Sequence, residues 1–358
     1  MADIFGLRII PDDGQKPVVL DGSMRYASYL GNCNLYSAGS TVSVTRPQRA
    51  NSRAMIIPRT TLSIGANISA SGPPMKWATS ISFDGSNVRC TSESINANNN
   101  NTVIGNVDVF SVQQSESPVN TYGLRIVNGS NFMEISDTGY AGYVTYRDVI
   151  TINGSWTVPQ SITSLGDYII YARWNNTDFP LFFDRSSNTI TTWTGFGSTD
   201  GSVQGGTVSN VQIVIVSCGF SPALPVSGYG LVIRNAVGQV TYSSKYPPVA
   251  WPDAYYNFGY YKLGDDGSGD YLNWVSPTGS VTAPMLPLCT IGFQRGDFNR
   301  GTGTYNFRKC LQSGFKMSGN SVSTSRAKTT LGDMEVQIYP RALQVACQLP
   351  CIDASYYF

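Results

Sequence analysis

FGLRI at residues 5–9, YGLRI at 122–126 and YGLVI at 229–233 are three versions of one short stretch, spaced about a hundred residues apart. In YGLRI, the Tyr, Leu and Ile side chains fall on one face of an extended chain and the Arg side chain falls on the other. Such alternation is typical of a half-buried β-strand. A turn signal follows each version, Asn128-Gly129 in the second, and another apolar run follows the turn. The stretch therefore predicts the first strand of a β-hairpin in three places.

Each predicted hairpin is followed by two further strand-like runs in a constant order. The first is an apolar run with a basic residue at or near its end: MIIPR (55–59), YIIYARW (168–174) and MLPLCTIGFQR (285–295). The second is an alternating run that closes each copy, at 106–110, 210–214 and 333–338. This recurrence predicts three tandem, separately folded β-sandwich-like domains and a short C-terminal tail. The predicted boundaries are 1–117, 118–224 and 225–345 for the domains and 346–358 for the tail.

The glycine, leucine and isoleucine of the motif define the three copies in this interpretation. They are Gly6, Leu7, Ile9, Gly123, Leu124, Ile126, Gly230, Leu231 and Ile233. Pro118 and Pro225 come at the two junctions, where stiff extended linkers are usual.

The composition independently favours an all-β fold. Of 358 residues, 13% are charged, while 36 are Gly, 19 are Pro and 21 are Tyr. No long window has the apolar spacing of an amphipathic helix, whereas short alternating runs bounded by Gly, Asn, Pro and Ser recur along the chain. We therefore expect antiparallel sandwiches or small barrels.

Charge and cysteine usage exclude several functional classes. The net charge is +1, which argues against nucleic-acid binding, since that needs a concentrated basic face. The densest basic cluster, Arg46, Arg49, Arg53 and Arg59, is interpreted as a solvated loop beside a strand. No apolar run has the length of a membrane span, and no secretory signal is recognised. The seven cysteines do not recur with the repeat, so we expect buried thiols of a reducing cytoplasm.

The residue types needed for most catalytic sites are missing. The chain has no histidine, which excludes Ser-His-Asp, Cys-His and HExxH sites, and it has no phosphate-binding GxxxxGK[ST] loop. Carboxylate pairs occur in TDFPLFFDR (177–185) and GDDGSGDY (264–271). They are better explained as strand-flanking and turn residues. The sequence thus predicts no enzyme, with no catalytic residues, no cofactor and no metal.

Aromatic residues are the remaining candidates for a binding site. They are dense in the second and third copies, where they could form core, protein interface or sugar-stacking surface. In DAYYNFGYYKLG (253–264), the adjacent tyrosines cannot all point inward from one strand. The interface candidates are Trp174, Trp193, Tyr255, Tyr256, Tyr260 and Tyr261.

The three motif regions resemble the start of small proteins encoded among the tail genes of tailed bacteriophages and prophages. The regions are FGLRIIPDDGQKPVVLDG (5–22), YGLRIVNGSNFMEISD (122–137) and YGLVIRNAVGQVTYSS (229–244). Those proteins begin with a Tyr-Gly-Leu-x-Ile/Val strand, a Gly turn and a strand that ends near Asp. Phe5 replaces the Tyr in the first copy, and the triplication departs from single-copy relatives. The resemblance implies a structural part of the tail near its tip, without catalysis or a cofactor.

Two functions are therefore carried forward. The first is a structural virion protein, a tail-tip, fibre-base or collar adaptor assembled in the host cytoplasm, which binds other virion proteins. The second is a receptor-binding tail protein that recognises host surface polysaccharide or an outer-membrane protein. A capsid decoration protein is a third, weaker possibility. The first copy is as regular as the others, which favours the adaptor, because receptor binders usually join an N-terminal anchor to a different distal domain.

Three stretches between the predicted strands differ in character between the copies. Residues 81–102 are polar and Asn-rich, 178–196 are aromatic, and 292–310 are basic. Since loops vary while a sheet is held by packing, we expect these stretches to contact the partner.

Overall fold

The computed structural model shows a fold made almost entirely of antiparallel strands. The described part contains strands β1 to β28, one short helix, α1 (Gln160–Thr163), and one 3-10 turn, η1 (Ala354–Tyr356). All strand pairs among these residues are antiparallel, so the predicted fold class is confirmed. The residues described are 6–10, 17–21, 25, 27–37, 41–66, 72–97, 102–114, 123–128, 131–136, 142–194, 203–224, 230–263, 273–299, 306–334 and 340–358.

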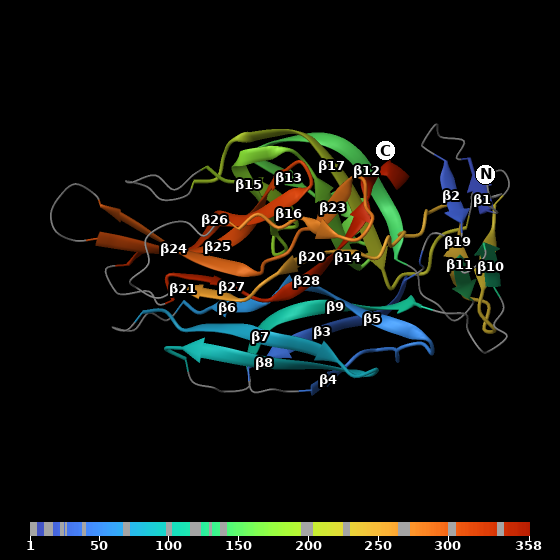
Figure 1. Ribbon diagram of the computed structural model, residues 1–358, viewed down its shortest axis with the longest axis horizontal. Coiled ribbons are helices and arrows are strands. Elements are labelled where there is room, and N and C mark those ends of the chain that lie inside the picture. The colour runs from blue at the N-terminus through green and yellow to red at the C-terminus, as the bar shows by residue number, and fades with distance from the viewer. Residues whose placement is uncertain are drawn as a thin grey trace.

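The three motif stretches form hairpins, as predicted, and the hairpins gather at one end of the molecule (Figure 1, right). Leu7 pairs with Leu20, Leu124 with Ile135, and Ile233 with Tyr242. We call the three hairpins the hairpin cluster. Its strands are β1 (Gly6–Ile9), β2 (Val18–Asp21), β10 (Gly123–Asn128), β11 (Asn131–Ser136), β18 (Val232–Arg234) and β19 (Val240–Ser243).

The hairpin cluster has a small core of its own, to which all three copies contribute. Leu20, Ile233 and Tyr242 are buried in it, and the motif leucines Leu7, Leu124 and Leu231 pack against it. Tyr143, which belongs to the second copy, is also buried in this core, and its hydroxyl donates a hydrogen bond to the Thr241 carbonyl. The first strand of each copy is therefore stabilised by the other two copies.

One arrangement of three strands occurs three times in the body of the protein. Each arrangement consists of the strand that follows the motif hairpin, a middle strand and a closing strand. In each case the closing strand lies between the other two. The first triad is β3 (Ala27–Tyr36), β9 (Val103–Gln113) and β5 (Ser52–Thr60). The second is β12 (Tyr143–Asn153), β17 (Thr207–Cys218) and β14 (Asp167–Arg173). The third is β20 (Ala254–Phe258), β28 (Cys347–Asp353) and β23 (Pro284–Pro287).

The three triads share one hydrophobic core, which we call the central core. Trp251 lies between an aromatic ring of the first triad and one of the second, 6.0 Å from Phe110 and 5.9 Å from Tyr171 between ring centroids. The second and third triads also join directly, because β14 pairs with β23 within one 15-stranded sheet. Buried members include Met55 and Phe110 from the first triad, Tyr171 and Val214 from the second, and Met285 and Ile352 from the third.

Outer sheets cover the triads on the side away from the central core. In the first copy, β4 (Thr41–Ser43), β8 (Asn87–Ile95), β7 (Met75–Phe83) and β6 (Leu62–Ile64) form a separate sheet, in the lower layer of Figure 1. In the upper layer, β13 (Ser155–Thr157), β16 (Thr189–Thr192) and β15 (Asn176–Asp184) continue into strands of the third copy. Those are β21 (Tyr261–Leu263), β27 (Ala342–Gln344), β24 (Gly292–Asn299), β25 (Asn306–Ser318) and β26 (Ser321–Met334), while β22 (Pro277–Thr278) pairs with β20.

Two predictions about the organisation of the chain are corrected. The domains at 1–117, 118–224 and 225–345 do not enclose separate cores, because the hairpin cluster and the central core each draw on all three. The segment 346–358 is no detached tail, since it contains β28, the central strand of the third triad. The run at 333–338, predicted to close the third copy, starts in the last residues of β26, and its remainder lies outside the described residues.

The three variable stretches are parts of β-hairpins rather than loops. They lie in the pairs β7–β8, β15–β16 and β24–β25. Each hairpin inserts side chains into a core; Leu181 and Ile190, for example, are fully buried. Among the described residues of these hairpins, the outward positions are the ones available to a partner.

Candidate functional site

The aromatic interface candidates divide into core and surface residues. Trp174, Trp193 and Tyr256 are buried and belong to hydrophobic clusters, so they are not contact residues in this structure. Tyr260 is 43% exposed, and Tyr255 and Tyr261 are partly exposed. The prediction that adjacent tyrosines point in different directions is confirmed on β20, where Tyr256 points inward and Tyr255 toward a cleft.

The motif residues have a structural place in the hairpins. Gly6, Leu7 and Ile9 lie on β1, and Gly123, Leu124 and Ile126 lie on β10. Leu231 comes directly before β18, the strand that contains Ile233. The Leu231 N–H donates to the Ser244 side-chain oxygen, and the Ser244 N–H donates to the Leu231 carbonyl. Gly230 precedes this pair and is exposed. The side chain of Ile126 lies outside the described residues.

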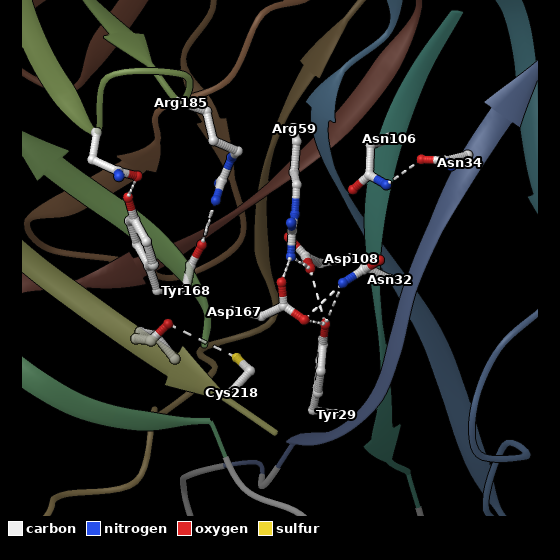
Figure 2. Close-up of polar contacts among 12 residues, drawn as sticks. Tyr29, Asn32, Asn34, Arg59, Asn106, Asp108, Asp167, Tyr168, Arg185 and Cys218 are labelled. Atoms are coloured by element: carbon white, nitrogen blue, oxygen red, sulfur yellow. Dashed lines mark hydrogen bonds and ion pairs between the residues drawn. The ribbon is translucent and has the colours of Figure 1, made fainter. Parts of the chain in front are cut away.

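A buried polar network joins the first and second triads (Figure 2). Arg59 lies at the end of β5, and Nε of its guanidinium donates to Asp108 Oδ2 at 2.7 Å, while Nη2 donates to Asp167 Oδ1 at 2.8 Å and also to Asp108. Asp167 begins β14, in the other triad. Tyr29 Oη lies 2.9 Å from Asp167 Oδ2, and Asn32 Nδ2 donates to the same oxygen at 2.7 Å. One guanidinium thus connects carboxylates of two copies.

Burial and charge together set the ionisation of this network. The side chain of Asp108 is 1% exposed and that of Arg59 is 12% exposed. Burial and the neighbouring carboxylates raise the pKa of Tyr29, so its hydroxyl stays protonated. Burial alone would raise the pKa of Asp167, but the hydrogen bonds and charge of Arg59 outweigh it and lower that pKa. In this network two carboxyl groups, those of Asp108 and Asp167, share one guanidinium.

Arg185 lies near this network and has a different environment. Its Nη1 and Nη2 both donate to the Tyr168 carbonyl at 3.2 Å, and its guanidinium lies 5.2 Å from the ring centroids of Tyr168 and Phe183. Desolvation and the positive charge of Arg59 lower the pKa of Arg185. The contacts are those of a cation stacked on aromatic rings, and they fix the turn after β15.

We call the contact region between two triads a seam. Among the described residues, the seams of the third triad with the second and with the first lack a buried ion network like that of Arg59. Between the second and third triads, Arg173 Nη1 donates to the Pro284 carbonyl at 3.2 Å beside the β14–β23 pairing. Between the first and third triads, Arg53 contacts both the Asp253 carboxylate and the Tyr255 hydroxyl. Here the surfaces separate and leave a cleft.

The cleft between the first and third triads consists of two adjoining cavities of about 570 and 210 Å³. We call it the seam cleft. Both cavities are lined by Arg53, Met55 and Tyr255. The larger one is bounded by β5 and β7 on one side and by β20 and the start of β28 on the other. Its volume is in the range of ligand-binding clefts, and it is the strongest candidate for a binding site in the described structure.

Sequence reasoning missed the residues that hold the seams. Arg53 and Arg59 lie on β5 and pair across copies, so interpreting the basic cluster as a solvated loop was wrong for these two. The one available signal was Asp108, a carboxylate inside the apolar run NVDVF. A charge in a buried strand requires a partner, but the sequence does not indicate which basic residue supplies it.

Burial raises the pKa of every cysteine thiol in the chain. All seven cysteines are free, and burial raises the pKa of Cys90 to about 11 and those of Cys310 and Cys351 to about 12. These thiols are therefore protonated and weakly nucleophilic at neutral pH. Within the described ranges, no three His, Cys, Asp or Glu side chains are placed to hold a metal ion. No helix in the described part of the chain is long and apolar enough to cross a membrane.

Comparison with known proteins gives one match. A search of curated proteins and a search of solved structures each found no significant similarity. The match is to the model of a protein family described as a family of unknown function, DUF6453, and it spans residues 6–336. This range begins at the first motif strand and includes the hairpin cluster, the first two triads and the Arg59 network. The chain therefore belongs to the DUF6453 family.

Proposed function

We propose that this protein is a structural component of a bacteriophage tail, an adaptor that joins other virion proteins at the tail tip, fibre base or collar. The observation that carries the proposal is that three triads of equal strand order, with their hairpins gathered at one end, share one core within a single chain. The resemblance of the motif to tail-gene proteins supports the same assignment.

The shared core matters because it makes one chain resemble an assembled trimer. Such a chain presents three related surfaces whose outer hairpins differ, β7–β8, β15–β16 and β24–β25. Surfaces that are related but unequal can bind a symmetric tail component together with neighbouring proteins that lack its symmetry. Linking them in one chain also raises the effective concentration of the second and third contacts once the first has formed.

The polar contacts between the triads support a role in holding the three copies together. Arg59 connects Asp108 and Asp167, and Arg53 connects the first and third copies. Removing one partner from a buried ion pair costs several kcal/mol, so the contacts around Arg59 resist separation of the triads. The alternative, a receptor-binding tail protein, is favoured by the seam cleft and the exposed Tyr260.

Deletion of the gene from the phage genome distinguishes these functions. An adaptor is required for assembly, so the deletion should yield particles with incomplete tails that a plasmid copy of the gene restores. Loss of a receptor binder would instead leave complete particles that fail to adsorb. Complete and infectious particles after deletion would refute both functions.

A further inference from the structure

We propose that the outer edge of β5 binds an extended peptide segment of another virion protein within the seam cleft, by adding a strand to the first triad. The inference rests on the proposed function, because the assembled tail supplies the segment. It assigns to the seam cleft a binding mode in which main-chain hydrogen bonds give affinity and side-chain pockets give specificity.

The backbone groups of β5 that face the cleft follow from its pairing with β9. The Gln114 N–H donates to the Asn51 carbonyl at 2.9 Å, one step before the Ser52–Gln113 pair. In an antiparallel pair, successive residues direct their N–H and C=O alternately toward and away from the neighbour. Asn51 faces β9, so Ala54 and Ile56 face away from it. Pro58, two residues after Ile56, also directs its backbone nitrogen away from β9. Proline has no N–H, so it is expected at such a position.

Among the described strands, none is hydrogen-bonded to this outer edge over Ala54 and Ile56. β5 is the last strand in the order β3-β9-β5. Within the described ranges, no hydrogen bond reaches the outward N–H and C=O of these two residues. Both residues are partly exposed and line the larger cavity. An uncovered strand edge is a template for another strand.

The same edge already accepts backbone from another copy, just beyond Pro58. The Thr290 N–H donates to the Arg59 carbonyl at 3.0 Å, and the Thr61 N–H donates to the Thr290 carbonyl at 3.1 Å. Thr290 follows β23 and belongs to the third copy. The fold therefore covers one end of this edge with a strand-like segment and leaves the part at 54–56 open.

The lining indicates which peptide would fit. Ile56, Ile81 and Phe258 give the larger cavity an apolar wall. The smaller cavity is lined by Arg25, Arg53 and Asp253, and Arg53 contacts the Asp253 carboxylate. An extended peptide with apolar side chains at alternate positions matches the apolar wall.

The first test is Ala54→Pro, which removes an outward N–H and leaves the β9 ladder in place. The matched control is Thr41→Pro, at the start of β4, an edge strand far from the cleft. Because the Val44 N–H donates to the Ser86 carbonyl, Thr41 also faces away from its neighbour. Both variants should melt cooperatively. The amount of Ala54→Pro in purified particles should fall at least tenfold and that of Thr41→Pro should not; normal incorporation of Ala54→Pro would overturn the inference.

The second test needs no variant. Hydrogen exchange, followed by mass spectrometry, compares residues 53–58 of the wild-type chain free and in purified particles. We expect exchange at least tenfold slower in the particle, and equal exchange would overturn the inference even if Ala54→Pro failed to fold. If the wild-type chain is present in particles but residues 53–58 exchange as fast as in the free chain, this inference alone is refuted. Absence of the wild-type chain from particles refutes the proposed function and the inference with it.

Discussion

Replacing Arg59 by Met should destabilise the protein by about 3–5 kcal/mol, the usual cost of removing one partner from a buried ion pair. Met retains much of the apolar stem, so the loss is that of the guanidinium. Asp108 is 1% exposed, and among the side chains of the described residues it would keep the hydrogen bond from the Tyr29 hydroxyl, at 3.2 Å. Asp167 is 34% exposed and could be hydrated. Most of the loss therefore comes from Asp108.

The assay is urea unfolding at pH 7, with two further variants to isolate the effect. Arg89→Met removes an exposed ion pair with Asp84 and should leave the urea midpoint nearly unchanged, since solvent screens such a pair. The double variant Arg59→Met/Asp108→Leu removes both buried charges and should recover most of the stability. A loss below about 1 kcal/mol for Arg59→Met would refute the reasoning, and so would a double variant no more stable than Arg59→Met.

Two more predictions concern acid stability and the shared core. The pKa values of Asp167, Asp184 and Asp353 are lowered in the folded state, because hydrogen bonds outweigh the effect of burial. These carboxylates therefore stabilise the fold fully above their unfolded pKa of about 4. This contribution to the free energy of unfolding is lost as the pH falls through the folded pKa values. The urea midpoint should therefore fall between pH 5 and 3, and by less in Asp167→Asn; equal acid sensitivity of that variant would contradict the role of Asp167. The fragment 118–224, expressed alone, should bind a hydrophobic dye and melt without cooperativity, since its part of the central core would face water; a cooperative melt near that of the full chain would contradict the shared core.

Local patterns were sufficient for the hairpins and for the middle and closing strands of the first two copies. The Tyr-Gly-Leu motif and its turn signals lie within about twenty residues, so alternation alone predicted β1–β2, β10–β11 and β18–β19. The middle and closing runs of the first two copies likewise became β5, β9, β14 and β17. In the third copy, the closing strand was predicted at 333–338, whereas β28 takes this place in the third triad. Only its long-range pairing with β20 and β23 distinguishes β28.

The shared cores and the seams could not be predicted in the same way. The apolar run of β17 indicates a buried strand, but it does not indicate whether Val214 packs on its own copy or on another. Arg59 and Asp167 are 108 residues apart, and no local pattern relates them. The seam cleft arises where the first and third copies meet without strand pairing over residues 54–56, so it too depends on tertiary arrangement.

A cryo-electron microscopy reconstruction of the purified phage particle, computed without imposed symmetry, tests the central claim most directly. The account predicts density for this chain at a junction of the tail, with its three triads intact around the central core and other tail proteins against its surface. A complete tail that contains no such density would contradict the assignment of this protein to the tail structure.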